Sequence, residues 1–195
     1  MDFIMKLWSK VAIPVALAIS ACLAWAADPG NEAHLPSQAA ADVLRDFAAA
    51  DAAFLAAGLV KENYQTDNLA SLIQYPSDEV VVVSLKGKEI RQAIERSLSL
   101  YPQSNSSFLQ LSGVEVVFSK SGAASQRIVS ISIGGMRLDE ARSYDVAMPA
   151  LLGRGGLGYF KIWDKTRITK TFPSTIEEVL KGKRYVETSP RWSAQ

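Results

Sequence analysis

Four consecutive valines, residues 80–83, form the centre of a β-branched, apolar run over residues 79–85. A strand with one solvated face alternates apolar and polar residues, whereas a strand covered on both faces is continuously apolar. The run therefore predicts a central strand that needs packing layers on both sides of its sheet. After a turn at residues 86–88, apolar residues recur at helical spacing over residues 89–100, which predicts a helix that supplies one such layer.

The rest of the chain mixes the same two periodicities. We predict a helix over residues 37–50 with Ser37 as its N-cap, strands over residues 52–55, 114–116, 127–133 and 144–148, a hairpin turn at Gly134-Gly135, and a C-terminal helix that begins with a capping box of Ser174 and Glu177 and ends before Gly182. Helices and strands in this order predict an α/β fold, a layered helix-sheet domain with its helices outside the sheets.

The first 26 residues have the pattern of a cleaved signal peptide. Lys6 and Lys10 form a positive start, residues 11–23 an apolar run, and Ala24-Trp25-Ala26 a small-x-small cleavage site. The apolar run is shorter than the roughly 20 residues that a membrane-spanning helix needs. We therefore predict an exported protein, periplasmic or secreted, with a linker at residues 27–36 and one folded domain at residues 37–190.

Cys22 leaves a second route open. The passage Ile19-Ser20-Ala21-Cys22 resembles a bacterial lipobox, in which the cysteine is lipidated and becomes the new N-terminus. Under this alternative the protein is a lipoprotein anchored through Cys22. Because the chain has one cysteine, both routes leave the fold without an internal disulfide.

Charge and motif content exclude several function classes. The formal net charge of +1 gives no bias toward nucleic acid, and the cations near the C-terminus are expected to form a solvated surface, so no nucleic-acid partner is expected. Residues 153–158 match a G-x-G-x-x-G dinucleotide motif by letter, but no strand–helix–strand unit follows. His34, the one histidine, is expected to be a solvated loop residue, so we predict no metal site, no cofactor and no catalytic residue.

Several passages occur in an order that resembles a known family. They are Asn68-Leu69-Ala70, residues 80–87 with Leu85-Lys86-Gly87 at their end, Phe108-Leu109-Gln110, and Gly155-Gly156-Leu157-Gly158-Tyr159. Together they resemble the C-terminal, substrate-specificity domain of the 5'-nucleotidases. In that family a preceding metallophosphatase domain hydrolyses the phosphate ester, and the C-terminal domain binds the nucleoside. The resemblance implies a stand-alone specificity domain, since these 195 residues lack the metallophosphatase domain.

The resemblance also implies where a ligand would bind. The family clamps a base between two aromatic rings. Tyr75 stands near the position of the first ring, and Leu151 takes the position of the second. Gly155 and Gly156 keep a glycine pair of the pocket loop, and Lys61 replaces an arginine that faces the ligand.

Arg154 and Tyr159 complete the set of candidate binding residues. Other family positions have lost their polar groups, because Leu157 replaces an acidic residue and Ala150 replaces an asparagine. The pattern favours an exported, non-catalytic relative that binds a nucleoside-like ligand, a small anionic ligand or a protein partner. The alternative hypothesis is a specificity subunit for a separately encoded metallophosphatase that hydrolyses nucleotides.

Overall fold

The computed structural model describes residues 27–123 and 126–195, so the predicted leader and Cys22 lie outside the described residues. The elements, in chain order, are α2 (Leu35–Ala48), β1 (Ala52–Ala56), η2 (Ala57–Leu59), η3 (Leu69–Leu72), β2 (Glu79–Lys86), α3 (Gly87–Ser97), β3 (Leu109–Ser112), β4 (Val114–Phe118), β5 (Ile128–Ile133), β6 (Met136–Arg137), β7 (Ser143–Pro149), α4 (Ala150–Gly153), η5 (Gly156–Lys161), η6 (Lys165–Arg167), β8 (Ile168–Thr175), α5 (Ile176–Leu180) and β9 (Trp192–Ala194). No helix among the described residues is both long and apolar enough to cross a membrane.

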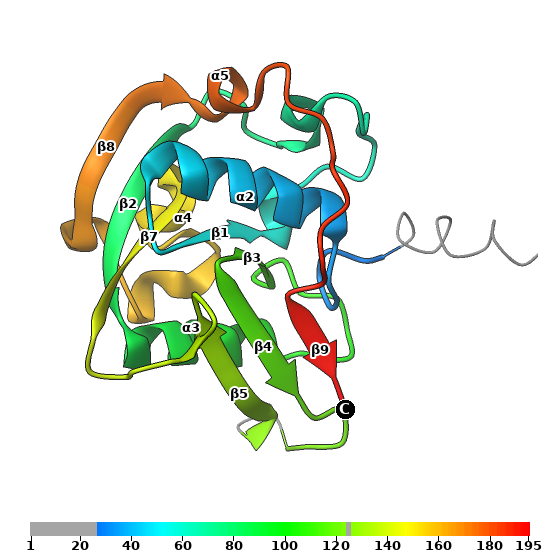
Figure 1. The fold of residues 1–195 in the computed structure, drawn as a ribbon, viewed down its shortest axis with the longest axis vertical. Coiled ribbons are helices and arrows are strands. Elements are labelled where there is room, and N and C mark those ends of the chain that lie inside the picture. The colour runs from blue at the N-terminus through cyan, green and yellow to red at the C-terminus, as the bar shows by residue number, and fades with distance from the viewer. Residues whose placement is uncertain (1–26, 124–125) are drawn as a thin grey trace, which may run out of the picture.

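The strands form two sheets (Figure 1). One has five strands in the order β3-β1-β7-β2-β8, and the other has four in the order β6-β5-β4-β9. The valine-rich strand β2 is flanked by β7 and β8, both antiparallel to it. Val80 to Val83 are at most 4% exposed, which confirms the prediction of a strand buried on both faces.

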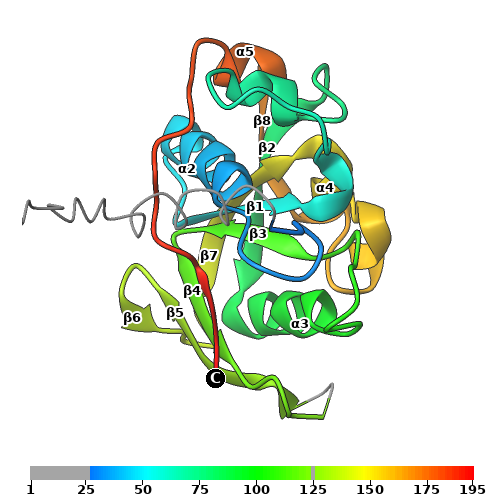
Figure 2. The ribbon, with the colours of Figure 1, turned by 90° about the vertical axis from the view of Figure 1, so that its right-hand side faces the viewer.

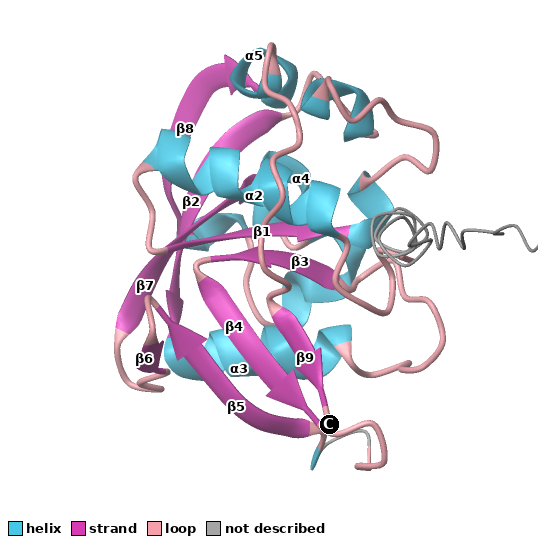
Figure 3. Ribbon diagram, turned by 45° about the vertical axis from the view of Figure 1, so that its right-hand side comes forward, coloured by secondary structure: helices cyan, strands magenta, loops and turns pink. Residues whose placement is uncertain are grey.

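Helices cover the five-stranded sheet from outside. In Figure 2 the strands of this sheet stand between α2 and α4, and α2 packs on β1, β3 and β7 while α4 packs on β2 and β7. Helix α3 contacts β2 of one sheet and β5 of the other, so it lies where the two sheets meet (Figure 3). The predicted α/β fold is therefore confirmed, with α2 and α4 outside the five-stranded sheet and α3 in contact with both sheets.

The chain crosses from one sheet to the other at Gly113, between β3 and β4. Gly113 has φ +72°, and a Cβ there would lie 2.5 Å from the carbonyl oxygen of Asp51. Both the left-handed backbone and the close approach require glycine at this crossing.

Several element boundaries differ from the sequence-based prediction. Helix α2 begins at Leu35, so Ser37 lies inside the helix and its hydroxyl bonds the ring of His34 instead of capping. The predicted turn at residues 86–88 is already helical, because Gly87 is the first residue of α3 and the Glu89 carboxylate accepts from the Lys86 amide at 2.8 Å. The capping box of α5 is Thr175 with Glu178, one residue later than predicted.

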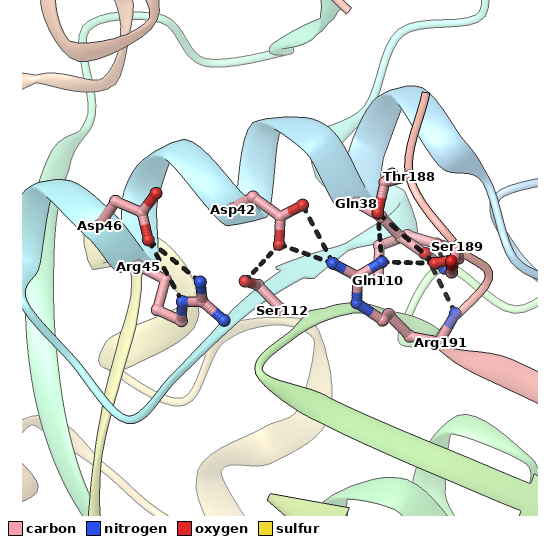
Figure 4. A network of polar contacts seen from close by, with 9 residues as sticks. All are labelled: Gln38, Asp42, Arg45, Asp46, Gln110, Ser112, Thr188, Ser189 and Arg191. Carbon is pink, nitrogen blue, oxygen red and sulfur yellow. Dashed lines mark hydrogen bonds and ion pairs between the residues drawn. The ribbon is translucent and has the colours of Figure 1, made fainter. Parts of the chain in front are cut away.

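The C-terminal segment returns to the start of the domain. Strand β9 pairs in parallel with β4. Just before it, one guanidinium nitrogen of Arg191 donates to both carboxylate oxygens of Asp42 in α2, each at 3.1 Å (Figure 4). Asp42 also accepts from the Ser112 hydroxyl at 2.5 Å. These contacts tie together the first helix, the end of β3 and the last strand.

Candidate functional site

An open cavity of about 500 Å³ lies beside Tyr75. Its walls come from the loop before β2, from α4 and from the glycine loop that follows α4. The lining residues are Tyr75, Ser77, Asp78, Leu151, Arg154, Gly155 and Gly156. The fold thus brings together five of the seven candidate residues named from the sequence, although their separation along the chain is large. Their role in binding a ligand stays a prediction.

Tyr75 presents its ring to this cavity from a short, well-anchored loop. Its side chain is 50% exposed, which is unusual for so large an aromatic residue. The loop is fixed below it, because the Asp78 amide donates to the Tyr75 carbonyl at 3.1 Å and the Ile176 amide donates to the Asp78 carbonyl at 2.8 Å. A held, half-exposed ring is the type of surface on which a flat heterocycle stacks.

Asp78 is a lining residue that the sequence did not reveal. One carboxylate oxygen accepts from the Leu151 amide at 2.8 Å, and the other accepts from the Glu79 amide at 3.1 Å. Asp78 therefore joins the start of β2 to the start of α4 and sets the distance between the Tyr75 loop and Leu151. An aspartate just before a strand is a common turn residue, so the sequence alone gave no reason to single it out.

Arg154 lies at the C-terminal end of α4, and its side chain is exposed. Its amide donates to the carbonyl of Ala150 at 2.9 Å, which holds the backbone in place. The guanidinium lies 3.8 Å from the carboxylate of Glu79, and both side chains are largely exposed. The cation is thus partly compensated by a neighbouring acid, and such an exposed pair is weak.

The glycine pair is required by the tight backbone of the loop. Gly155 has φ +88°, and a Cβ there would lie 2.8 Å from both the Phe160 Cα and the Trp163 carbonyl oxygen. At Gly156 a Cβ would lie 2.5 Å from the Leu151 side chain. The segment then continues as the 3-10 helix η5 with left-handed residues inside it, and not as the helix that a dinucleotide motif would open.

Replacing Gly155 by alanine is expected to destabilise the domain by about 2 kcal/mol, because it adds backbone strain and a clash with main-chain atoms. The matched control is Gly135→Ala, whose φ is +78° but whose Cβ would meet nothing within 4 Å. That variant should lose only about 1 kcal/mol. Urea denaturation of both variants measures the difference. Equal losses would show that the glycine loop is not sterically confined.

Two candidate residues do not line the cavity. Tyr159 has 0% exposure, its hydroxyl donates to the Ser107 carbonyl at 2.5 Å, and its ring stacks on Trp163 at 4.5 Å. Burial raises the pKa of the Tyr159 hydroxyl well above its usual range. Tyr159 is a core residue that supports the loop from below.

Lys61 also lies apart from the cavity lining. Its amide donates to the Leu72 carbonyl at 2.8 Å, next to the bridge that joins Val60 to Ile73. The backbone pairing that follows η2 carries the lysine into this bridge, so the charge expected from the resemblance is not part of the Tyr75 site.

His34 is buried, whereas the sequence analysis predicted a solvated loop residue. It is 2% exposed, its Nδ1 lies 2.7 Å from the Ser37 hydroxyl, and its Nε2 lies 2.9 Å from the Tyr64 hydroxyl. Burial lowers the pKa of His34 from 6.5 to about 4. The prediction was wrong because helix α2 starts earlier than expected and brings the histidine against the core.

The donor set of this domain does not fit the two-metal centre of a nucleotidase. Both ring nitrogens of the one histidine are already hydrogen-bonded inside the protein. Within residues 27–123 and 126–195 there is also no group of three or more His, Cys, Asp or Glu side chains that could hold a metal.

Comparison with known proteins adds sequence relatives to this geometry. A family model described as "5'-nucleotidase, C-terminal domain" matches residues 30–164. Human 5'-nucleotidase is 30% identical over 109 residues, which make up 51% of this chain and 18% of that protein. Snake venom 5'-nucleotidase of Naja atra is 30% identical over 89 residues, 42% of this chain and 17% of that protein.

Solved structures show the same fold. A 5'-nucleotidase precursor from Thermus thermophilus aligns with a TM-score of 0.70 at 21% identity, over 87% of this chain and 37% of that one. NAD nucleotidase from Haemophilus influenzae aligns with a TM-score of 0.62 at 15% identity, over 83% of this chain and 33% of that one. Among the sequence relatives, the matched part of the chain covers 18% of human 5'-nucleotidase and 17% of the Naja atra protein, less than a fifth of each. Because the family model matches residues 30–164, well over half of its length, the chain belongs to the 5'-nucleotidase C-terminal domain family.

Proposed function

We propose that this chain is an exported domain that binds a flat, nucleoside-like ligand in the Tyr75 cavity and does not hydrolyse it. The observation that carries the proposal is the half-exposed Tyr75 ring, held at a cavity of about 500 Å³ that Leu151 also lines. An exposed aromatic ring and an apolar side chain in one cavity offer apolar contact area to a flat heterocycle.

Binding without hydrolysis agrees with the hydrogen bonds of the cavity. Asp78 is the one acid among the lining residues, and its hydrogen bonds to the Leu151 and Glu79 amides give it the role of holding the start of β2 and the start of α4 together. Export is supported by the leader pattern of residues 1–26 and by the venom proteins among the relatives.

Titration calorimetry with nucleosides at millimolar concentration tests the proposal. Tyr75→Ala is expected to weaken binding by at least about tenfold, because stacking of a base on an aromatic ring contributes about 1–3 kcal/mol. Tyr75→Phe keeps the ring and should bind within about twofold of the unmodified chain.

Met136→Ala is the matched control for Tyr75→Ala. Met136 is 64% exposed in the β6 hairpin of the other sheet, so its truncation removes a large apolar side chain far from the cavity in the fold. It should leave binding unchanged. If no nucleoside or nucleotide produces heat with the unmodified chain, the small-molecule function is wrong and a protein partner becomes the better hypothesis.

A second candidate function is supported by the family match over residues 30–164. In this alternative the domain serves as the specificity subunit of a separately encoded metallophosphatase. Co-expression with such a protein should then yield a stable complex that hydrolyses nucleotides. Hydrolysis by the isolated chain with added divalent metal would contradict both candidate functions.

A further inference from the structure

The charged side chains at the Tyr75 cavity are two acids and one base. Asp78 lines it, and Glu79 follows directly as the partner of Arg154. Arg154 is the one cation among the lining residues, and it already lies 3.8 Å from Glu79.

The hydrogen-bonding groups of the cavity point to the same preference. The Asp78 oxygens each accept one backbone amide, and a carboxylate oxygen has room for a second donor. A carboxylate beside a stacking ring suits a heterocycle that carries amino groups or a positive charge. A phosphate near the same carboxylate would instead be repelled.

We infer that the Tyr75 cavity selects unphosphorylated, amino-bearing or cationic flat heterocycles over their phosphorylated forms, with Asp78 as the residue that determines this specificity. This inference rests on the proposed function, because it assigns a ligand class to the same cavity. It gives the domain a preference for the nucleoside type of molecule over the nucleotide.

Calorimetry with four probes tests the inference: adenosine, adenosine 5'-monophosphate, guanosine and N7-methylguanosine, whose ring carries a fixed positive charge. Adenosine should bind about threefold to tenfold more tightly than its monophosphate at low salt. N7-methylguanosine should bind more tightly than guanosine by a similar factor. Both ratios should move toward one at about 0.5 M salt, because salt screens interactions between exposed charges.

Asp78→Asn tests the assigned residue, because asparagine keeps an oxygen for the Leu151 amide while removing the charge. It should reduce both ratios by about threefold. Glu115→Gln is the matched control, since it makes the same change of charge on an exposed side chain of β4 in the other sheet. It should leave the ratios unchanged. Thermal unfolding of Asp78→Asn checks that it folds, and the salt dependence of the unmodified chain tests the charge preference independently of this variant.

The outcomes separate the inference from the proposed function. If none of the four probes binds, the proposed function fails and the inference fails with it. If adenosine binds but its monophosphate binds equally well or better, the proposed function stands and the charge preference is wrong. If the preference exists and Asp78→Asn retains it in full, the assignment to Asp78 is wrong.

Discussion

Replacing Trp192 by alanine is expected to destabilise the domain by about 4 kcal/mol, although this residue lies three positions before the C-terminus, in a strand from Trp192 to Ala194. Its ring is 5% exposed and lies 4.6 Å from that of Phe108, so truncation would leave a cavity in the core. Its indole N–H donates to the Leu109 carbonyl at 2.8 Å, and that acceptor would lose its partner inside the protein. Urea denaturation measures the loss.

Trp192→Phe is the matched control for this substitution. It keeps an aromatic ring against Phe108 but removes the indole donor to Leu109, so about 2 kcal/mol of destabilisation is expected. The urea m-value should remain that of the unmodified chain if the last strand unfolds together with the rest. A loss below about 1 kcal/mol for Trp192→Ala, or a smaller loss than that of Trp192→Phe, would contradict the view that this strand belongs to the core.

The contacts of the C-terminal segment explain why this strand is expected to unfold with the domain. Besides the Trp192 ring, Arg191 contacts Asp42 of α2 with both distances at 3.1 Å, and its amide donates to the Gln38 side chain at 3.1 Å (Figure 4). These side chains are largely shielded from water, so their pairing is stronger than that of exposed ions. Detachment of the strand would break contacts to α2 and to both sheets together.

Local patterns predicted the elements whose own residues determine their structure. The continuous valines of β2 and the periodic apolar face of α3 are strong local signals, and both elements formed, with α3 beginning two residues earlier than predicted. Strands β8 and β9 were missed for different reasons. Strand β8 is a largely exposed edge strand with Pro173 inside it, and β9 has three residues and is defined by pairing with β4. Because β4 and β9 lie far apart in the chain, a local sequence pattern cannot reveal that they pair.

The position of the α5 capping box shows a similar limit. Ser174 with Glu177 and Thr175 with Glu178 both have the required spacing, so the local sequence allows either box. The pairing of Glu79 with Thr175 between β2 and β8 selects the second. The register of a strand pair therefore decided a helix boundary.

The candidate site was predictable as far as the family resemblance extends. The resemblance brought Tyr75, Leu151 and the glycine loop to attention, and the fold places them around one cavity. It could not tell which way an aromatic ring faces, and Tyr159 turned out to be core. Asp78 was missed because its importance arises from the contact with the Leu151 amide, which is 73 positions away in the chain.

The stability of the domain is expected to fall by about 3 kcal/mol between pH 7 and pH 4 because of His34 alone. Burial lowers the pKa of His34 from 6.5 to about 4, and the charge of nearby Asp28 offsets this only in part. Between these two values the unfolded chain binds a proton that the folded chain does not. The contribution of this group is therefore complete above pH 6.5, falls as the pH decreases toward 4, and levels off below that.

The protonation of His34 can be measured directly. Since the chain has one histidine, an NMR titration follows the His34 ring without overlap from another, and its midpoint should lie near the value of about 4. His34→Gln supplies the matched denaturation curve, because glutamine keeps a polar group beside Ser37 and Tyr64 but does not titrate. The gap in stability between the unmodified chain and this variant should narrow by about 3 kcal/mol from pH 7 to pH 4. A gap that stays constant with pH, or a midpoint near 6.5, would mean that the ring is solvated and that the start of α2 does not enclose it.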